Sequence, residues 1–163
     1  MAAGNTYTPI QTTNGTGASS ITFSSISSSY TDLVLVIGGA VSSGVSSYIY
    51  VNGDTGANYG YTYMQGYAAS SASGRGTSAN QIYFGPMHAN GNIIIANFPS
   101  YANTSYYKSV LIRQNSNWPT GTLSATIATW RSASAINSIT VVTGGVQTFP
   151  TACVFTLYGI AAA

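Results

Sequence analysis

The amino-acid sequence predicts an all-β protein with a jelly-roll-like β-sandwich and an extended N-terminal arm. Val, Ile, Thr and Tyr are abundant, and these residues favour strands. No window combines a 3.6-residue apolar period with helix caps. The candidate strands are short, follow one another closely and are separated by Gly, Asn and Pro, as in sandwiches and barrels. At 163 residues, the length suits one domain.

The elements follow from local patterns along the chain. Residues 1–17, rich in Thr, Gly and Asn, predict the arm, and residues 18–163 predict the sandwich domain. The continuous apolar run at 33–37 predicts a central strand buried on both faces. Residues 68–80, rich in Ser, Ala and Gly, predict an exposed flexible loop. About ten strands are expected, at residues 20–23, 33–37, 47–51, 59–63, 81–84, 92–98, 106–114, 122–130, 138–143 and 153–158.

A hydrophobic core is expected from the most apolar of these strands. A chain of this size can bury roughly 70% of its unfolded surface, so it needs no disulfide or metal to fold. The single cysteine, Cys153, lies in an apolar run and is predicted to be a buried small hydrophobe. The expected core residues are Val34, Leu35, Val36, Ile93, Ile94, Ile95, Ile139, Val141, Phe155 and Leu157.

Charge is scarce, and this narrows the function classes. The chain has four Lys and Arg and two Asp, with a net charge of +2. Four scattered cations cannot form the basic stripe of a nucleic-acid-binding protein. The longest apolar runs fall far short of the roughly 20 residues of a membrane helix. A surface of uncharged polar residues suits permanent contact with other proteins better than life as a concentrated monomer.

Residues for catalysis or metal binding are equally few. His88 is the only histidine, no Gly-x-Ser-x-Gly motif occurs, and nothing brings Asp32 and Asp54 together as a glycosidase pair. One carboxylate in the 52–58 segment is too few for a calcium loop. The G-x-G-x-x-A match at 74–79 lacks the strand before it and the helix after it that a phosphate-binding loop needs. The sequence therefore predicts no enzyme, no metal site and no cofactor.

Tyrosines alternate along two predicted strands on either side of the Asn52-Gly53 turn. They are Tyr48, Tyr50, Tyr59, Tyr61 and Tyr63. The two strands could pair as a hairpin with one aromatic face. Tyrosine joins apolar area to a hydroxyl group and is common at interfaces. Packing in the core or between subunits is the preferred interpretation, and a platform that stacks sugars is the alternative.

Four stretches together resemble surface proteins of tailed-bacteriophage virions. They are residues 21–35, the NGDTGANY segment at 52–59, residues 130–140 and the FTLYGI segment at 155–160. The pattern is similar to that of small capsid-decorating (cement) proteins and of C-terminal β domains of tail-fibre proteins. The resemblance implies a jelly-roll-like sandwich, usually trimeric, on the outside of a virion.

The resemblance leads to a functional hypothesis. A short chain that starts with Met favours a stand-alone capsid cement protein, located on the outer capsid surface, with itself (as a homotrimer) and the phage major capsid protein as partners. The N-terminal arm is the expected capsid contact, through Thr6, Tyr7, Thr8, Pro9 and Ile10. The alternative is a tail-fibre receptor-binding domain that recognises a host surface polysaccharide.

Overall fold

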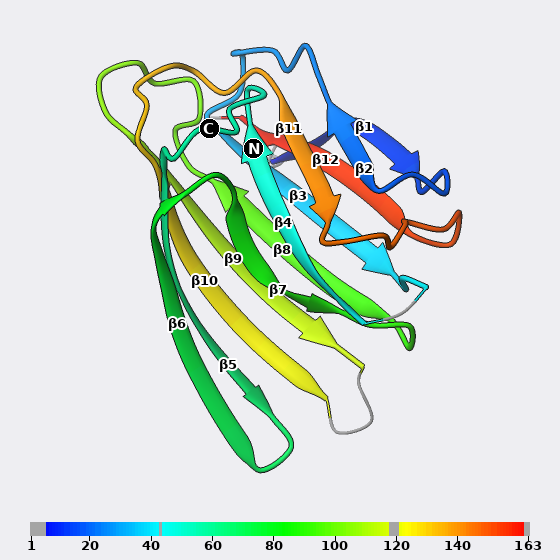
Figure 1. The fold of residues 1–163 in the computed structure, drawn as a ribbon. Helices are drawn as coiled ribbons and strands as arrows, with labels where there is room; N and C mark the ends of the chain where they lie inside the picture. The colour runs from blue at the N-terminus through cyan, green and yellow to red at the C-terminus, as the bar shows by residue number, and fades with distance from the viewer. Residues whose placement is uncertain (1–5, 43, 118–120, 162–163) are drawn as a thin grey trace.

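The computed structural model describes residues 6–42, 44–117 and 121–161, and these residues form twelve strands in two antiparallel sheets (Figure 1). The strands are β1 (Tyr7–Asn14), β2 (Ser20–Phe23), β3 (Asp32–Gly39), β4 (Val45–Val51), β5 (Tyr59–Tyr67), β6 (Ser70–Ala79), β7 (Ile82–Met87), β8 (Asn92–Phe98), β9 (Lys108–Ser116), β10 (Thr122–Trp130), β11 (Ile139–Thr143) and β12 (Val154–Ile160).

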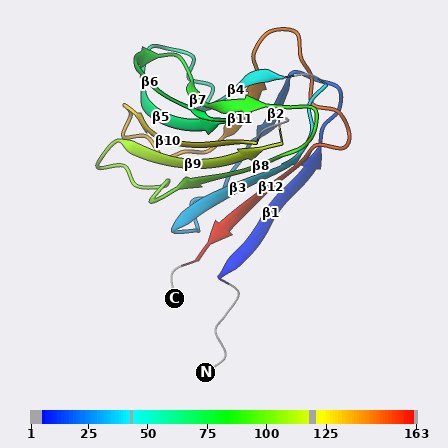
Figure 2. The ribbon, with the colours of Figure 1, turned by 90° about the horizontal axis from the view of Figure 1, so that it is seen from below.

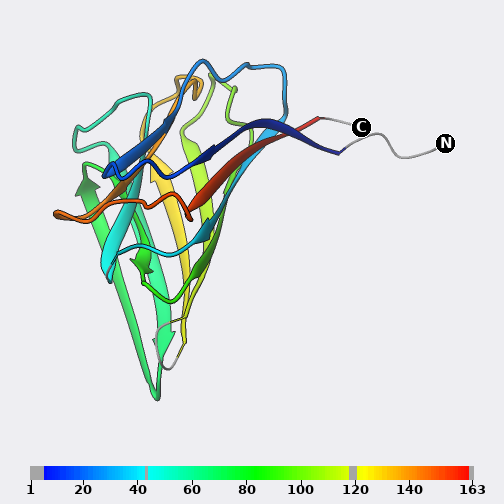
Figure 3. The ribbon, with the colours of Figure 1, turned by 90° about the vertical axis from the view of Figure 1, so that its right-hand side faces the viewer.

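The two sheets differ in size. The large sheet has eight strands in the order β1-β12-β3-β8-β9-β10-β5-β6, and the small sheet has four in the order β2-β11-β4-β7. The chain crosses between the sheets repeatedly, so strands adjacent in sequence often lie in different layers. In Figures 2 and 3 the small sheet lies against one side of the curved large sheet. The predicted fold class, an all-β jelly-roll-like sandwich, is confirmed.

The core fills the space between the two sheets. Burial alternates strictly along β9 and β10, so one face of each strand is buried and the other exposed. The small sheet contributes side chains such as Ile49, Ile82 and Val141 to this layer. Cys153 is fully buried here, as expected. The predicted core residues Leu35, Ile94, Ile139, Val141, Phe155 and Leu157 all belong to the core.

Four predicted core residues lie on the other side of the large sheet. Ile93 is 59% exposed, and Val36 and Ile95 are half-buried. Val34 is buried, but it alternates with the core residues Leu33 and Leu35 and so faces away from the core. Burial on both faces was predicted only for residues 33–37, of which Leu33, Val34, Leu35 and Ile37 are buried and Val36 is half-buried. The large sheet is covered on one face only, so alternate residues of each apolar run lie outside.

The N-terminal segment is extended but is not a free arm along most of its length. Tyr7–Asn14 forms β1, which pairs antiparallel with β12 at one edge of the large sheet. Residues 1–5 of the predicted arm lie outside the described residues. The Gly15 amide donates to the Cys153 carbonyl oxygen at 2.7 Å, and the Gly17 amide donates to that of Phe149 at 2.9 Å. The predicted arm therefore belongs to the sandwich from residue 7 onward.

The predicted flexible loop at 68–80 is wrong, because Ser70–Ala79 forms β6, a ten-residue strand paired with β5. Its glycines accept tyrosine rings from β5. A Cβ atom added to Gly74 would lie 2.6 Å from Tyr63 Oη, and one added to Gly76 would lie 2.6 Å from Tyr61 Cε1. Aromatic side chains that cover strand glycines are a known device for stabilising a sheet. The glycines of this segment thus make room for the tyrosine rings, and they do not indicate a loop.

This packing predicts that Gly74→Ala destabilises the protein by about 1–3 kcal/mol, since the new methyl group must displace the Tyr63 ring. Gly66→Ala, in β5, is the matched control because its Cβ would meet nothing within 4 Å. The control should be neutral or slightly stabilising, since alanine restricts the unfolded chain. Urea unfolding measures both variants. Equal midpoints for the two would contradict the proposed tyrosine–glycine packing.

Candidate binding surface on the eight-stranded sheet

The face of the large sheet that points away from the small sheet, here called the outer face, is unusually apolar. Cross-strand pairing places Ile93, Leu111, Leu123, Ile127 and Met64 on it. Ile93, Leu123, Ile127 and Met64 are 59–69% exposed, and Leu111 is 44% exposed. Arg113 lies among them on the same face. Exposed apolar side chains gathered on one face are a mark of interaction sites. This face is therefore the main candidate surface of the molecule.

The predicted capsid-binding residues lie at the edge of this sheet. Thr6 is exposed just before β1, and Tyr7 is 55% exposed with its ring edge-on to Tyr158 at 6.1 Å. Thr8 is half-buried, and Ile10 packs against the core. Pro9 has no amide hydrogen, and the register shifts between Pro9 and Gln11. Both features interrupt the row of backbone groups that an edge strand offers to another strand.

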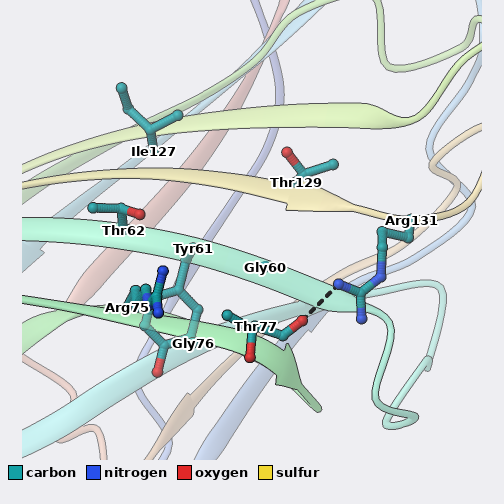
Figure 4. A pocket seen from close by; sticks show the side chains of 9 residues that line it. All are labelled: Gly60, Tyr61, Thr62, Arg75, Gly76, Thr77, Ile127, Thr129 and Arg131. Atoms are coloured by element: carbon teal, nitrogen blue, oxygen red, sulfur yellow. Dashed lines mark hydrogen bonds between the residues drawn. The ribbon is translucent and has the colours of Figure 1, made fainter.

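At the opposite edge the outer face is hollowed over β10, β5 and β6. One hollow of about 650 Å³ is lined by Gly60, Tyr61, Thr62, Arg75, Gly76, Thr77, Ile127, Thr129 and Arg131 (Figure 4). A second of about 690 Å³ is lined by Met64, Gln65, Gly66, Ser71, Ala72, Ser73, Arg113, Leu123, Ser124 and Ala125. Neither hollow can be recognised in the sequence, because the Ser/Gly-rich residues 68–80, which include Arg75, look like a loop.

Arg131 is held in a fixed orientation at the first hollow. Its Nη1 donates to the Thr77 carbonyl oxygen and its Nη2 to that of Ala57, each at 2.6 Å. These bonds tie the start of the 131–138 segment to β6 and to the turn before β5. A guanidinium has five N–H donors, so others stay available to a ligand.

The five tyrosines singled out by the sequence do not form a hairpin. Tyr48 and Tyr50 belong to β4 in the small sheet, whereas Tyr59, Tyr61 and Tyr63 belong to β5 in the large sheet. The reason is that the chain crosses between layers at the Asn52-Gly53 turn. Tyr50 is half-buried against the core.

Three of these tyrosines nevertheless meet around a fourth, Tyr83 of β7, which the sequence analysis did not single out. The ring centroid of Tyr83 lies 4.9 Å from that of Tyr63, 5.7 Å from Tyr48 and 6.3 Å from Tyr61. Burial, with the neighbouring tyrosines, raises the pKa of Tyr83 to about 12. The cluster joins the two sheets by packing, and its rings lie on the inner side of β5 rather than on the outer face.

Tyr59 has a structural role at the start of β5. Its side chain is fully buried, and its hydroxyl donates to the Asp54 carbonyl oxygen at 2.8 Å. The Tyr59 hydroxyl oxygen accepts the Val51 amide hydrogen at 3.1 Å. Burial raises the pKa of Tyr59 to about 12. The phenol thus closes the turn between β4 and β5 and is not available as a stacking platform.

The NGDTGANY segment is a hydrogen-bonding centre. Asp54 Oδ2 accepts the Trp130 Nε1 hydrogen at 2.6 Å, and the carboxylate also accepts bonds from the Gly56 amide and the Asn58 side chain. The bond from Trp130 is the main reason that the pKa of Asp54 lies below its ordinary value. The Asn52 side-chain oxygen accepts the amides of residues 137 and 138. The segment joins β4 to the end of β10.

The two carboxylates lie in separate places. Asp32 Oδ1 accepts the Ser100 amide at 2.7 Å, and Asp54 binds Trp130. In the described ranges, no group of three or more His, Cys, Asp or Glu residues could hold a metal ion. No helix of the described residues is long and apolar enough to cross a membrane.

Comparisons with known proteins add little to this description. No family model matches the chain, and no curated protein matches it. Among solved structures, it is similar to an alginate lyase in complex with an alginate tetrasaccharide, at 9% identity and a TM-score of 0.32. The match covers 82% of this chain and 72% of the lyase chain. A likeness this distant carries no argument about function.

The Asp54 contacts predict the effect of Trp130→Phe. This change removes the N–H donor but keeps an aromatic ring, and it should destabilise the protein by about 1–3 kcal/mol. Because the folded-state pKa of Asp54 is lowered, its stabilisation is present above the ordinary pKa of 3.8 and is lost as the pH falls further. Denaturant unfolding between pH 7 and pH 2 should therefore show a smaller acid loss in the variant. An unchanged acid profile would contradict the role of the Trp130 bond.

The buried tyrosines predict a loss of stability at alkaline pH. Tyr59 and Tyr83 have pKa values near 12 in the folded chain and 10.0 ordinarily. Their stabilisation is complete below about pH 10 and is lost as the pH rises toward 12, by up to ~1.4 kcal/mol per pH unit for each group. Tyr83→Phe should flatten this decline in unfolding experiments between pH 9 and pH 12. Tyr107→Phe, at an exposed ring, is the matched control for loss of a phenol. Equal profiles for the wild type and Tyr83→Phe would refute the assignment.

Proposed function

We propose that the chain is a non-enzymatic structural protein of a bacteriophage particle, a capsid cement protein that binds the outer head surface as a homotrimer. The observation that carries the proposal is the uncovered apolar outer face of the large sheet. The resemblance of the 52–59 and 155–160 segments to virion surface proteins supplies the kind of particle.

The β1–β9 part of the outer face suits contact with another copy of the chain. Its apolar and aromatic side chains are Tyr7, Ile93, Leu111, Val154 and Tyr158. Ile93 is the most exposed of them, at 59%. A sheet face of this kind can bury apolar area without any rearrangement of loops. Burial yields about 25 cal/mol for each Å² of apolar surface removed from water.

The low charge of the chain supports permanent assembly. Only six of 163 residues are Asp, Lys or Arg. Of the cations, Lys108 is buried, and its Nζ donates to the Tyr106 and Ala133 carbonyl oxygens. In a trimer, three linked contacts with the capsid raise avidity roughly 100- to 10,000-fold over one contact. Such a clamp resists internal pressure without any chemistry.

The first test is the oligomeric state. Light scattering on the purified wild type should give three times the 16.8 kDa chain mass. Ile93→Asp should give a folded monomer, because the new charge would be buried without a partner in the interface. Val146→Asp, at a 91% exposed loop position, is the matched control and should stay trimeric. Circular dichroism confirms that each variant is folded. A wild type that is monomeric at high concentration would refute the proposal.

The second test uses phage heads that lack this protein. Added wild type should bind them in multiples of three and raise the temperature at which packaged DNA is released. Thr6→Asp, at the exposed residue before β1 and outside the contact between copies, should weaken binding while leaving the trimer intact. Heads that neither bind the protein nor gain heat resistance would refute the cement function.

A tail-fibre receptor-binding domain for a host surface polysaccharide is the second candidate. The observation that favours it is the pair of hollows lined by arginines and hydroxyl side chains on β10, β5 and β6. Binding of saccharides by the purified protein, together with no affinity for heads, would favour this function over the first.

A further inference from the structure

The exposed positive charge of the chain is gathered on one part of one face. Arg75 lies on β6 and Arg113 on β9, and Arg131 directly follows β10. Pairing sets Arg75 opposite Thr62 and Arg113 opposite Ala125, so both belong to the outer face. The fourth cation is the buried Lys108. In a chain with so few charges, three arginines beside two adjoining hollows form a distinct electrostatic feature.

The two hollows follow each other along the same three strands. The first hollow is lined by Thr62, Ile127 and Arg75. On each of the three strands, the next residue that points outward lies two positions away, and these residues, Met64, Ala125 and Ser73, line the second hollow. From Thr129 to Leu123 the strand rises about 3.3 Å per residue, so the hollows form a groove roughly 20 Å long. This groove, called here the arginine groove, has the length of an extended polymer segment rather than of one small ion.

Among the described residues, no carboxylate side chain neutralises the arginine groove. Neither carboxylate lines either hollow: Asp32 accepts the Ser100 amide, and Asp54 accepts the Trp130 indole hydrogen. Arg131 is oriented in advance by the Thr77 and Ala57 carbonyl oxygens. Ordering a long side chain before binding lowers the entropy cost of the complex. The planar guanidinium favours carboxylates, which it can bind through two parallel hydrogen bonds.

The remaining lining residues narrow the class of ligand. Thr62, Thr77 and Thr129 offer hydroxyl groups beside the arginines, as Figure 4 shows, and Ser71 and Ser73 offer them in the second hollow. Tyr61 also lines the first hollow, but its half-buried ring lies over Gly76 on the inner side of the sheet. Hydroxyls with separate arginines suit a sugar polymer that carries carboxylates.

We propose that the arginine groove binds an acidic polysaccharide, with Arg75 and Arg131 holding carboxylates and the threonine hydroxyls meeting sugar hydroxyls. This proposal rests on the second candidate function, in which the chain binds a polysaccharide, and it does not depend on the capsid function. It specifies that the polysaccharide is negatively charged and that it binds in the arginine groove.

The test is calorimetric titration of the wild type with oligogalacturonate at low salt. Binding is expected, and the fully methyl-esterified oligomer, which has the same sugar backbone without charge, should bind at least tenfold more weakly. Arg75→Gln should weaken oligogalacturonate binding about tenfold, and Arg75→Lys should recover only part of it because lysine lacks the planar fork. Arg75 is exposed on β6, so its replacement should leave the fold intact.

A matched pair of variants separates the groove from long-range attraction. Thr62→Glu and Gln11→Glu each add one negative charge at an exposed strand position, but only Thr62 lines the groove. Thr62→Glu should abolish binding, whereas Gln11→Glu should change it less than twofold. Equal effects of the two variants would overturn the assignment to the groove.

Other probes decide the class of ligand. Poly-glutamate, single-stranded DNA or inorganic phosphate binding as tightly as oligogalacturonate would overturn the proposal. Equal binding of the charged and methyl-esterified oligomers would overturn the acidic ligand while keeping saccharide binding. No binding of any saccharide would overturn both this inference and the tail-fibre candidate, with no bearing on the trimer and capsid tests.

Discussion

One sheet of this sandwich has eight strands and the other has four, and this difference in size determines which side chains are buried. The small sheet can cover only one face of the large sheet, so β9 and β10 each have one buried row of side chains and one exposed row. The buried rows form the core. The exposed rows carry isoleucine, leucine and methionine, which a protein normally hides. Stability and interaction are thus divided between the two faces of one sheet.

Tyrosine and glycine hold the end strands of the large sheet together. The outermost pair, β5 and β6, gains its packing from Tyr61 and Tyr63, whose rings cover Gly76 and Gly74. Tyr83 of β7 then contacts both rings and links the two layers. In a chain almost without charges, aromatic packing takes the place of ion pairs, and it is insensitive to salt where ion pairs are not.

The sequence predicted the fold class and most strands, because alternation and turn residues act locally. Residues 92–98 and 122–130 were placed without error, since their apolar periods are clear. The strand at 70–79 could not be recognised, because its partner tyrosines lie on another strand and a Ser/Gly-rich segment has no apolar period of its own. Ile93 was assigned to the core for a related reason. An apolar run shows that a strand is apolar on both sides, and only the tertiary arrangement shows how many sides are covered.

The candidate site was harder to predict than the fold, for a reason of distance along the chain. Arg75, Arg113 and Arg131 are far apart in sequence and look like scattered cations. Only the strand order β9-β10-β5-β6 brings them to one end of the outer face. The same order leaves β1, β12, β3 and β8 without arginine, and β9 carries both Leu111 of the proposed copy contact and Arg113 of the groove, so the two proposed surfaces meet at β9. A trimer built on the apolar end would present three arginine grooves, and linked weak contacts of that kind are how repeated sugar polymers are held.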